Sequence, residues 1–560
     1  MKNIWEISQR QHKNIIDQLL ANRGVVLTGG SRAKKVFFEP DFESDLHPFA
    51  KMKGLEGAVS RIVKAKESNE TIGIFSDYDA DGIPGAALLY RTLEQIGIKA
   101  EVYIPNREVG YGLSEDGIDF LISKKCSLIV TIDLGIRSVL EAVYCREKGV
   151  DLIITDHHLP GDEIPAATIV VNPKQPHDDY PFKELCGCGV AFKLITGLST
   201  RFPKELDSKF LKWSLDLVAI STIADVVPLL DENRTLAKFG LLVINKTKNV
   251  GLKSLIKVIG LDEQKKIDAY QVGFQIAPRI NAPGRVDHAT KSFELLISND
   301  ENESLELANW LNEKNMTRQD QMEKAQAEAV KKIESKKLFE NKIIIVSGEW
   351  QRGIIGPTAS RLVEKYGRPV IMFAREDETM TGSARSVSGV NIVEIFELCS
   401  SEIAKFGGHK GAAGITVKKD NFENFCKKIY DVSEKSITRD ALIKKIKIDA
   451  ELALTDLTMG LHADLTKFEP FGMGNSRPVF LVKGVYFKYA KFVGKTANHF
   501  SAVVEDANQK FKVIWFNCPE QADFFQNENK YDIVFTLSVD EWQNKKTLSL
   551  NIQDLKISEI

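Results

Sequence analysis

The sequence has few features of a membrane or secreted protein. No run of apolar residues approaches the ~20 that a membrane-spanning helix needs. Polar residues interrupt the apolar positions of residues 1–20, so we expect an amphipathic helix there and no secretory signal. The seven cysteines are scattered and odd in number, which argues against a disulfide framework and favours a reducing cytoplasm.

The chain also lacks an excess of charge of either sign. Lys and Arg number 75 and Asp and Glu number 77, so the formal net charge of −2 excludes histone-like wrapping of nucleic acid. A nucleic-acid partner stays compatible with this balance if basic residues cluster locally. Hydrophobic residues make up 43% of the chain, which is enough apolar surface to exclude long disorder.

The 560 residues predict about three or four domains. From residue 71 onward, short apolar runs alternate with helical stretches, which is typical of a parallel sheet covered by helices on both faces. We expect its strands at residues 71–75, 100–104, 128–132, 152–155 and 168–171.

Two later changes of pattern indicate further parts. Residues 301–337 are rich in Glu, Lys, Gln, Asn and Ala and contain neither Pro nor Gly, which predicts a long helix that connects two lobes. A buried strand follows at residues 342–346 and opens a second α/β region. From about residue 446, short strands predict a small barrel or sandwich.

Three aspartates at alternate positions follow the first expected strand. Asp77, Asp79 and Asp81 cannot lie close together in ionised form unless cations neutralise them, and Gly82 lets the chain bend into the next helix. A calcium-binding EF-hand loop opens with the same spacing. It requires a glutamate at the twelfth position, which here is Leu88, so we consider that alternative weak.

Similar chemistry follows two further strands and one helix. Asp133 comes after the third expected strand, Asp156-His157-His158 after the fourth, and Asp225 closes a helical segment. The carboxyl ends of parallel strands meet at one crevice, and oxygen ligands with one imidazole suit Mn²⁺ or Mg²⁺ better than zinc. We therefore expect a metal site formed by Asp77, Asp79, Asp81, Asp133, His157 and Asp225.

In this order, these residues resemble the four motifs of the DHH phosphoesterase superfamily. Longer phrases resemble the RecJ family within it, which consists of single-strand-specific 5′→3′ DNA exonucleases. The resemblance extends from about residue 45 to the end of the chain. The phrases are LCGCGVAFKL at 185–194, STIADVVPL at 221–229, IAPRINAPGR at 276–285, FGGHKGAAG at 406–414 and PFGMGNSRPVF at 470–480.

The resemblance implies an α/β fold and an exonuclease function. It implies two divalent cations, Mn²⁺ or Mg²⁺, and a cytoplasmic monomer that degrades single-stranded DNA from a free 5′ end in repair and recombination. A single-strand-binding protein and a helicase are the implied protein partners. The implied parts are a helical and loop segment at 1–70 packed on the catalytic domain, a parallel-sheet DHH catalytic domain at 71–298, a connecting helix at 299–340, a smaller α/β DHH-associated domain at 341–435 and a C-terminal β-barrel (OB-fold) at 446–560.

The resemblance also implies roles for single residues. The second histidine of the motif, His158, would face the substrate phosphate, and Asp156 would orient the histidines. With Asp133 and His157 they form the expected catalytic set, and the six expected metal ligands match the metal-binding positions of the family.

Further residues are expected to hold phosphates, although a single arginine is more often part of a surface salt bridge. By resemblance, Arg107, Ser383 and Arg385 would receive the terminal 5′-phosphate. Two positions depart from the family phrases, since Gln351 replaces a histidine and Ala384 replaces a glycine. The complete set of expected phosphate contacts is Arg107, Arg279, Asn281, Ser383, Arg385 and His409.

Two other functions stay open at the level of sequence. A DHH hydrolase of oligoribonucleotides or cyclic dinucleotides needs only the two lobes, so the additional C-terminal strands argue against it. A non-catalytic replication scaffold of this superfamily would have lost carboxylates, whereas all the motifs are filled here.

Overall fold

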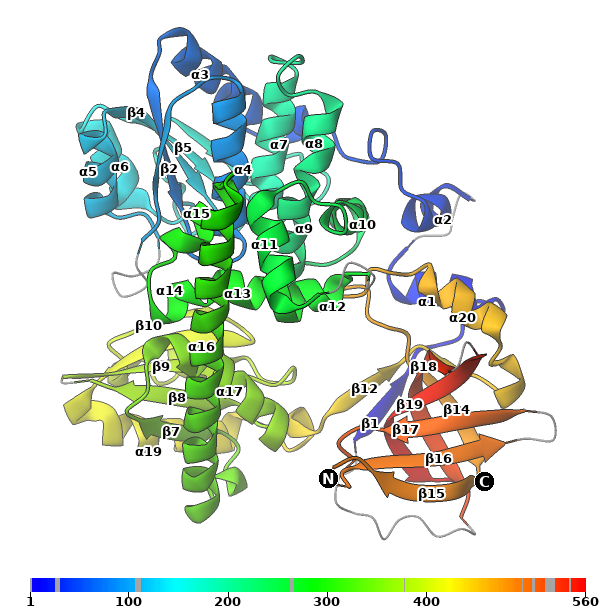
Figure 1. Ribbon diagram of the computed structural model, residues 1–560. Coiled ribbons are helices and arrows are strands. Elements are labelled where there is room, and N and C mark those ends of the chain that lie inside the picture. The colour runs from blue at the N-terminus through cyan, green and yellow to red at the C-terminus, as the bar shows by residue number, and fades with distance from the viewer. Residues whose placement is uncertain are drawn as a thin grey trace. The chain divides into compact units, whose positions relative to one another are not determined.

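The computed structural model describes residues 3–25, 31–105, 112–261, 266–376, 378–495, 497–505, 509–518, 529–542 and 545–559. The chain forms two compact units (Figure 1). The larger unit comprises Leu46–Val227 and Leu236–Ile443, and the smaller unit comprises Met1–Asp45, Pro228–Thr235 and Lys444–Ile560. Among the described helices, none combines the length and the hydrophobicity that a bilayer crossing requires.

A five-stranded, all-parallel sheet forms the first part of the larger unit, as the sequence predicts. The strand order is β3-β2-β4-β5-β6, so the chain leaves β2 first to one side and later to the other. Ligand sites in open parallel sheets lie at such a reversal, beyond the carboxyl ends of the strands. The strands are β2 (Thr71–Ser76), β3 (Ala100–Tyr103), β4 (Cys126–Ile132), β5 (Asp151–Thr155) and β6 (Ile169–Val171).

Helices cover both faces of this sheet (Figure 1). Apolar side chains of α5 and α6 form one core with the sheet, for example Ile118 and Cys145 with Ile129. On the other face, α4 lies so close to β4 that a side chain at Gly85 would be 2.6 Å from Ile132. The covering helices are α3 (Leu55–Glu67), α4 (Gly82–Gln95), α5 (Glu115–Ser123), α6 (Val139–Glu147) and α7 (Gly187–Ser199).

The long helix expected at residues 301–337 is α16, Glu301–Ser335. It packs on α11 (Val250–Ile259) and α15 (Thr290–Ile297) of the first part and on α17 (Arg352–Tyr366) of the second part (Figure 1). The second part has a mixed sheet in the order β10-β11-β9-β8-β7. Its strands are β7 (Ile344–Gly348), β8 (Val370–Arg375), β9 (Thr379–Arg385), β10 (Lys405–His409) and β11 (Ala412–Lys418).

The smaller unit contains a seven-stranded sheet in the order β13-β14-β18-β19-β17-β16-β15. Most of its aromatic side chains form the core, and Phe480, Phe487 and Phe500 are buried, whereas Tyr489 is exposed. The strands are β13 (Ala450–Glu451), β14 (Phe480–Val485), β15 (Phe487–Val493), β16 (His499–Glu505), β17 (Lys510–Trp515), β18 (Tyr531–Trp542) and β19 (Lys545–Ile557).

The expectation that residues 1–70 pack as one segment on the catalytic domain is wrong for residues 1–45, which belong to the smaller unit. Strand β1 (Ile4–Ile7) pairs in parallel with β12 (Lys445–Ile448). Leu19 and Leu20 of the first helix are buried in the core formed by the C-terminal strands. The expectation failed because β1 and these leucines contact residues more than 400 positions away in the chain. The local sequence contains no signal for such distant contacts.

Residues 228–235 also belong to the smaller unit, although the prediction assigned them to the catalytic domain. The guanidinium of Arg234 is buried and lies 3.9 Å from the ring centroid of Phe37. It donates hydrogen bonds to the carbonyl oxygens of Phe37 at 2.7 Å, Phe468 at 2.8 Å, Glu469 at 3.0 Å and Lys467 at 3.1 Å. One buried side chain satisfies four backbone carbonyl groups, through two buried and two partly buried hydrogen bonds, and this fixes the short segment in the smaller unit.

Candidate metal centre

The acidic loop between β2 and α4 is folded around its own carboxylates. Oδ1 of Asp79 accepts the backbone N–H groups of Asp81 at 2.8 Å and Gly82 at 3.1 Å. A Cβ at Gly82 would lie 2.5 Å from the carbonyl oxygen of Asp77, so only glycine fits this turn. The loop therefore holds three aspartates at the carboxyl end of a central strand.

Asp81 is buried against the first turn of α7. Its Oδ2 accepts the N–H of Gly187 at 2.6 Å, and its Oδ1 accepts the N–H of Cys188 at 2.8 Å. Despite these donors, burial, followed by the charge of Asp79, raises the pKa of Asp81 to about 6. The carboxylate is thus held firmly in a place where its negative charge needs compensation.

Asp133 follows β4 with its backbone in the left-handed region, at φ 64°. Its N–H donates to the carbonyl oxygen of Thr155 at 3.0 Å, which ties the turn to the next strand. Burial, and then the charges of Asp81 and the other nearby aspartates, raise the pKa of Asp133 well above its usual range. A Cβ at Gly187 would lie only 2.5 Å from the Cβ of Asp133, so the helix start and this carboxylate are in close contact.

Asp156 fixes the two histidines that follow it. Its Oδ1 accepts the backbone N–H groups of His157 at 2.7 Å and His158 at 3.0 Å, and its Oδ2 accepts the N–H of Ile136 at 2.9 Å. Nδ1 of His158 lies 2.8 Å from the same Oδ1. Burial opposes the ionised form of Asp156, but the contact with His158 outweighs it and lowers the pKa of the carboxyl. An ionised carboxylate only accepts, so Nδ1 of His158 carries the proton.

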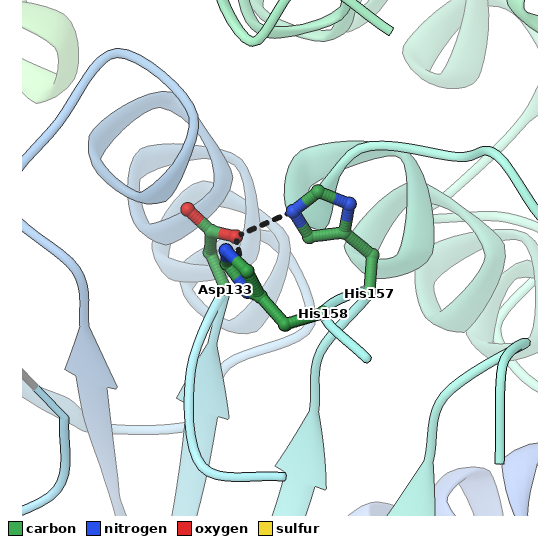
Figure 2. A group of neighbouring side chains, drawn as sticks. All are labelled: Asp133, His157 and His158. Carbon is green, nitrogen blue, oxygen red and sulfur yellow. Dashed lines mark ion pairs between the residues drawn. The ribbon is translucent and has the colours of Figure 1, made fainter. Parts of the chain in front are cut away.

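His157 points its Nε2 into the group of aspartates. This nitrogen lies 3.2 Å from Oδ1 of Asp133, 3.7 Å from Oδ2 of Asp225 and 3.8 Å from Oδ2 of Asp81. Figure 2 shows His157 and His158 approaching the same Asp133 oxygen. Burial lowers the pKa of His157 to about 3, so the imidazole is neutral and its ring nitrogen can act as a ligand.

Asp225 joins this group from the end of α9 (Leu215–Ala224). Its N–H donates to the carbonyl oxygen of Ser221 at 2.9 Å, which continues the helix by one residue. Burial, and then the charges of Asp81 and Asp79, raise the pKa of Asp225 to about 9.

The donor atoms fit divalent cations. They form three overlapping groups in which all ligand atoms lie within 4.8 Å of one another. Nε2 of His157 is buried and makes no hydrogen bond with any of the described residues. A buried polar atom of this kind, facing several carboxylate oxygens whose pKa values are raised, matches a site for a cation with oxygen and imidazole ligands. The groups are Asp77–Asp79–Asp133, Asp81–His157–Asp225 and Asp133–His157–His158.

Two of the expected phosphate contacts lie in one helical segment. Oδ1 of Asn281 accepts the N–H of Ala80 at 2.7 Å, so Asn281 is at the acidic loop. The guanidinium of Arg279 donates to the carbonyl oxygen of Gln275 at 2.7 Å and to Oδ1 of Asn312 at 2.9 Å. Its contacts are thus internal, and its role toward phosphate stays a prediction. Arg107 lies outside the described residues.

The other three expected contacts lie together on the second sheet. In the register of the strands, Ala412 pairs with both His409 and Arg385, so these two residues are two strands apart, or about 10 Å. Nη1 of Arg385 donates to Oγ of Ser383 at 3.0 Å. Ala384, which replaces the glycine expected here, lies in β9 with its side chain in the hydrophobic core. Gln351 is exposed and immediately precedes α17.

The sequence analysis did not identify the groups that hold Asp81 and the segment of Asn281 in place. The N–H groups of Gly187 and Cys188 hold Asp81, yet the phrase that contains them suggested no role because backbone donors have no side-chain signature. Arg285 donates to the carbonyl oxygen of Gly353 at 3.1 Å, which links the segment that carries Asn281 to the start of α17.

Three protein-family models match the chain. The model of the DHH family, N-terminal domain, matches residues 71–222, that of the DHHA1 domain matches residues 340–435, and that of the RecJ OB domain matches residues 448–554. A single-stranded-DNA-specific exonuclease RecJ from Bacillus subtilis (strain 168) is 36% identical over 97% of this chain and 68% of its own length. The protein of the same name from Escherichia coli (strain K12) is 35% identical over 77% of this chain and 78% of its own.

The chain belongs to the RecJ family. Among solved structures, RecJ in complex with Mn²⁺ from Thermus thermophilus is similar with a TM-score of 0.82 and 27% identity, over 100% of this chain and 80% of that one. A structure of exonuclease RecJ bound to manganese has a TM-score of 0.60 and 33% identity, over 69% of this chain and 96% of that one. The α/β fold with a DHH part, a DHHA1 part and an OB domain is therefore confirmed.

Proposed function

We propose that this chain is an exonuclease that removes nucleotides from the 5′ ends of single-stranded DNA by metal-dependent hydrolysis. The observation that carries the proposal is the convergence of aspartates and His157 from three strand ends and one helix end, in a member of the RecJ family. The relatives from Bacillus subtilis and Escherichia coli are named single-stranded-DNA-specific exonucleases. The OB domain supports this substrate, because such domains hold single strands by stacking bases on aromatic side chains.

Two divalent cations, Mn²⁺ or Mg²⁺, would be held by the metal set predicted from the sequence. When bound, they would neutralise the scissile phosphate and lower the pKa of the attacking water. That set is Asp77, Asp79, Asp81, Asp133, His157 and Asp225.

The residues of the chain then contribute orientation and proton placement. Asp156 holds the protonated Nδ1 of His158, which leaves the opposite ring edge of His158 for a phosphate oxygen. The side chain of His158 is 43% exposed, whereas that of His157 is 7% exposed, and this difference supports a role of His158 toward the substrate. Burial disfavours the charged imidazole, but the hydrogen bond with Asp156 outweighs burial and raises the pKa of His158, so it can donate to the phosphate.

We propose that the 5′→3′ direction depends on recognition of the terminal phosphate by Arg107, Ser383 and Arg385. Ser383 and Arg385 lie on β9 and Nη1 of Arg385 donates to Oγ of Ser383, which supports this role because an arginine fork matches phosphate oxygens. We further propose that the chain acts as a cytoplasmic monomer in DNA repair and recombination, with a single-strand-binding protein and a helicase as partners. Its seven cysteines are all free, which agrees with a reducing compartment.

Digestion of single-stranded DNA labelled at either end tests the proposal. With Mn²⁺ or Mg²⁺, we expect 5′-labelled strands to release labelled mononucleotides at once, 3′-labelled strands to shorten progressively, and EDTA to stop both reactions. Blunt duplex DNA, oligoribonucleotides and cyclic dinucleotides serve as comparison substrates. Release of nucleotides first from the 3′ end would overturn the direction, and a preference for a cyclic dinucleotide would overturn the substrate.

A further inference from the structure

Two aromatic side chains stack on each other at the surface of the larger unit. The rings of Tyr270 and Phe274 are 4.8 Å apart between centroids and are inclined by only 29°. Tyr270 is 60% exposed and Phe274 is 68% exposed. Aromatic side chains usually bury their large apolar area, so two exposed and nearly parallel rings indicate a surface that binds a flat apolar group.

The backbone beneath the rings is a π-helical turn, η2 (Val272–Ile276), in which the N–H of Ala277 donates to the carbonyl oxygen of Val272. Pro278 explains this turn. In a regular α-helix it could not donate to Phe274 four residues earlier, and its ring would clash with that carbonyl group. The wider turn avoids the clash, and Arg279 satisfies the carbonyl group of Gln275 at 2.7 Å. Single π-turns of this kind are frequent at functional sites.

This turn lies beside the candidate metal centre. A Cβ placed on Gly273 would be 3.6 Å from Cγ2 of Ile223, two residues before Asp225 in the chain. At its other end the segment continues to Asn281, whose side chain accepts the N–H of Ala80 in the acidic loop. The ring pair and the acidic loop are thus joined through one short, hydrogen-bonded stretch of backbone.

We propose that Phe274, with Tyr270 stacked behind it, is a stacking site for a nucleobase of the bound single strand. The inference rests on the proposed function and adds a site that holds one base of a strand entering the metal centre. Every nucleobase has a flat π-face, so the site accepts all four bases without reading their edges. Contact with the Tyr270 ring restricts rotation of the Phe274 side chain, so the outer face of the Phe274 ring stays available to a base.

Fluorescence of 2-aminopurine, a base analogue that loses emission when stacked, tests this site. The parent protein carries Asp133→Asn to prevent digestion, and it is mixed with Mn²⁺ and single strands that have 2-aminopurine at one position from the 5′ end. We expect quenching to peak at one position or two adjacent positions. Phe274→Ala should abolish that peak and weaken strand binding by about 5- to 150-fold, the range that corresponds to stacking of one base.

Three comparisons separate stacking from damage to the fold. Phe274→Tyr keeps a ring and should keep the peak, and Phe339→Ala removes a phenyl ring that is 37% exposed elsewhere in the larger unit and should change nothing. An abasic nucleotide at the quenched position should weaken binding to the parent protein but cause no further loss with Phe274→Ala. Equal quenching and affinity for Phe274→Ala, or the absence of a peak in the parent protein, would overturn the stacking site. Digestion of single strands by the unsubstituted protein reports on the proposed function separately.

Discussion

Nε2 of His157 lies 3.2 Å from Oδ1 of Asp133, and both side chains are buried. Nδ1 of the next residue, His158, lies 3.7 Å from the same oxygen but 2.8 Å from Asp156. Burial lowers the pKa of His157, whereas Asp156 raises that of His158. The pKa values of two adjacent histidines are therefore shifted in opposite directions, so one is suited to bind a cation and the other to donate a proton.

The crowding of carboxylates predicts opposite effects of Asp133→Asn on activity and on stability. Loss of this ligand should reduce metal-dependent digestion by about 1000-fold or more, since cation stabilisation of the scissile phosphate is worth several kcal/mol. In EDTA the variant should unfold at a higher temperature than the unsubstituted protein, because one buried charge is removed from a group of like charges.

Thermal unfolding with and without Mn²⁺, together with single-strand digestion, measures both effects. Asp179→Asn is the matched control because Asp179 is an exposed aspartate in the same unit. It should leave the activity, the stability and the Mn²⁺-dependent rise in unfolding temperature unchanged. Near-normal turnover by Asp133→Asn would contradict the metal assignment.

A second prediction separates two glycines of the same helix turn. Gly187→Ala would place a methyl group 2.6 Å from Oδ1 of Asp133, so the carboxylate must move and affinity for Mn²⁺ should fall by about 10-fold or more. At Gly189 the nearest atom to such a methyl group is 3.4 Å away, which is an ordinary contact. Gly189→Ala should therefore keep the affinity and stabilise the helix by about 0.5–1 kcal/mol.

The Mn²⁺ concentration that gives half-maximal digestion, read for both variants, checks this contrast. No ligand is removed in either protein, so a difference between them reports on the geometry around Asp133. If both variants needed the same Mn²⁺ concentration, the close approach of α7 to Asp133 would have no importance for the metal site.

The convergence of the aspartates could be predicted from the sequence because it follows from topology. Parallel strands place their carboxyl ends at one edge, so residues after β2, β4 and β5 must meet wherever the helices between them are long enough. Burial on both faces, which gives continuous apolar runs, made these strands visible in the sequence.

Features formed by backbone groups or by distant pairing could not be predicted. The donors that hold Asp81 are amide groups, and their position depends on where α7 begins rather than on side chains. Strand β1 has only four residues, and its partner begins at Lys445, so no local pattern links them. The π-helical turn at Phe274 avoids a clash with the ring of Pro278. This clash can be foreseen only if the segment is already assumed to be helical.

Arg234 leads to a prediction for the stability of the smaller unit. Arg234→Met keeps the apolar stem but removes the donors to four carbonyl groups, two of them in buried hydrogen bonds, so the free energy of unfolding should fall by about 3 kcal/mol. Arg234→Lys should recover only part of this loss, because an ammonium group lacks the planar fork of guanidinium. Urea unfolding of the full chain, followed by tryptophan fluorescence, measures the change, and Arg201→Met, at an exposed arginine, is the control. Equal stability of Arg234→Met and Arg201→Met would show that the buried hydrogen bonds do not hold residues 228–235.

The last prediction concerns the 5′ end. Arg385 lies beside Ser383 on β9, far along the chain from the acidic loop, and a fork of guanidinium donors matches a terminal phosphate. A hydrogen bond to a charged group is typically worth ~1.5–3 kcal/mol. Arg385→Ala should therefore reduce kcat/KM on 5′-phosphorylated strands by about 10- to 100-fold and change little on strands with a 5′-hydroxyl.

Both substrates are tested with the same variant, so the ratio of the two rates cancels general effects on folding and on metal binding. Arg375→Ala, at an exposed arginine at the end of β8, should keep the ratio of the unsubstituted protein. An equal loss on both kinds of end would mean that Arg385 contacts an internal phosphate or only supports the sheet, and the 5′ end would then have to be recognised elsewhere.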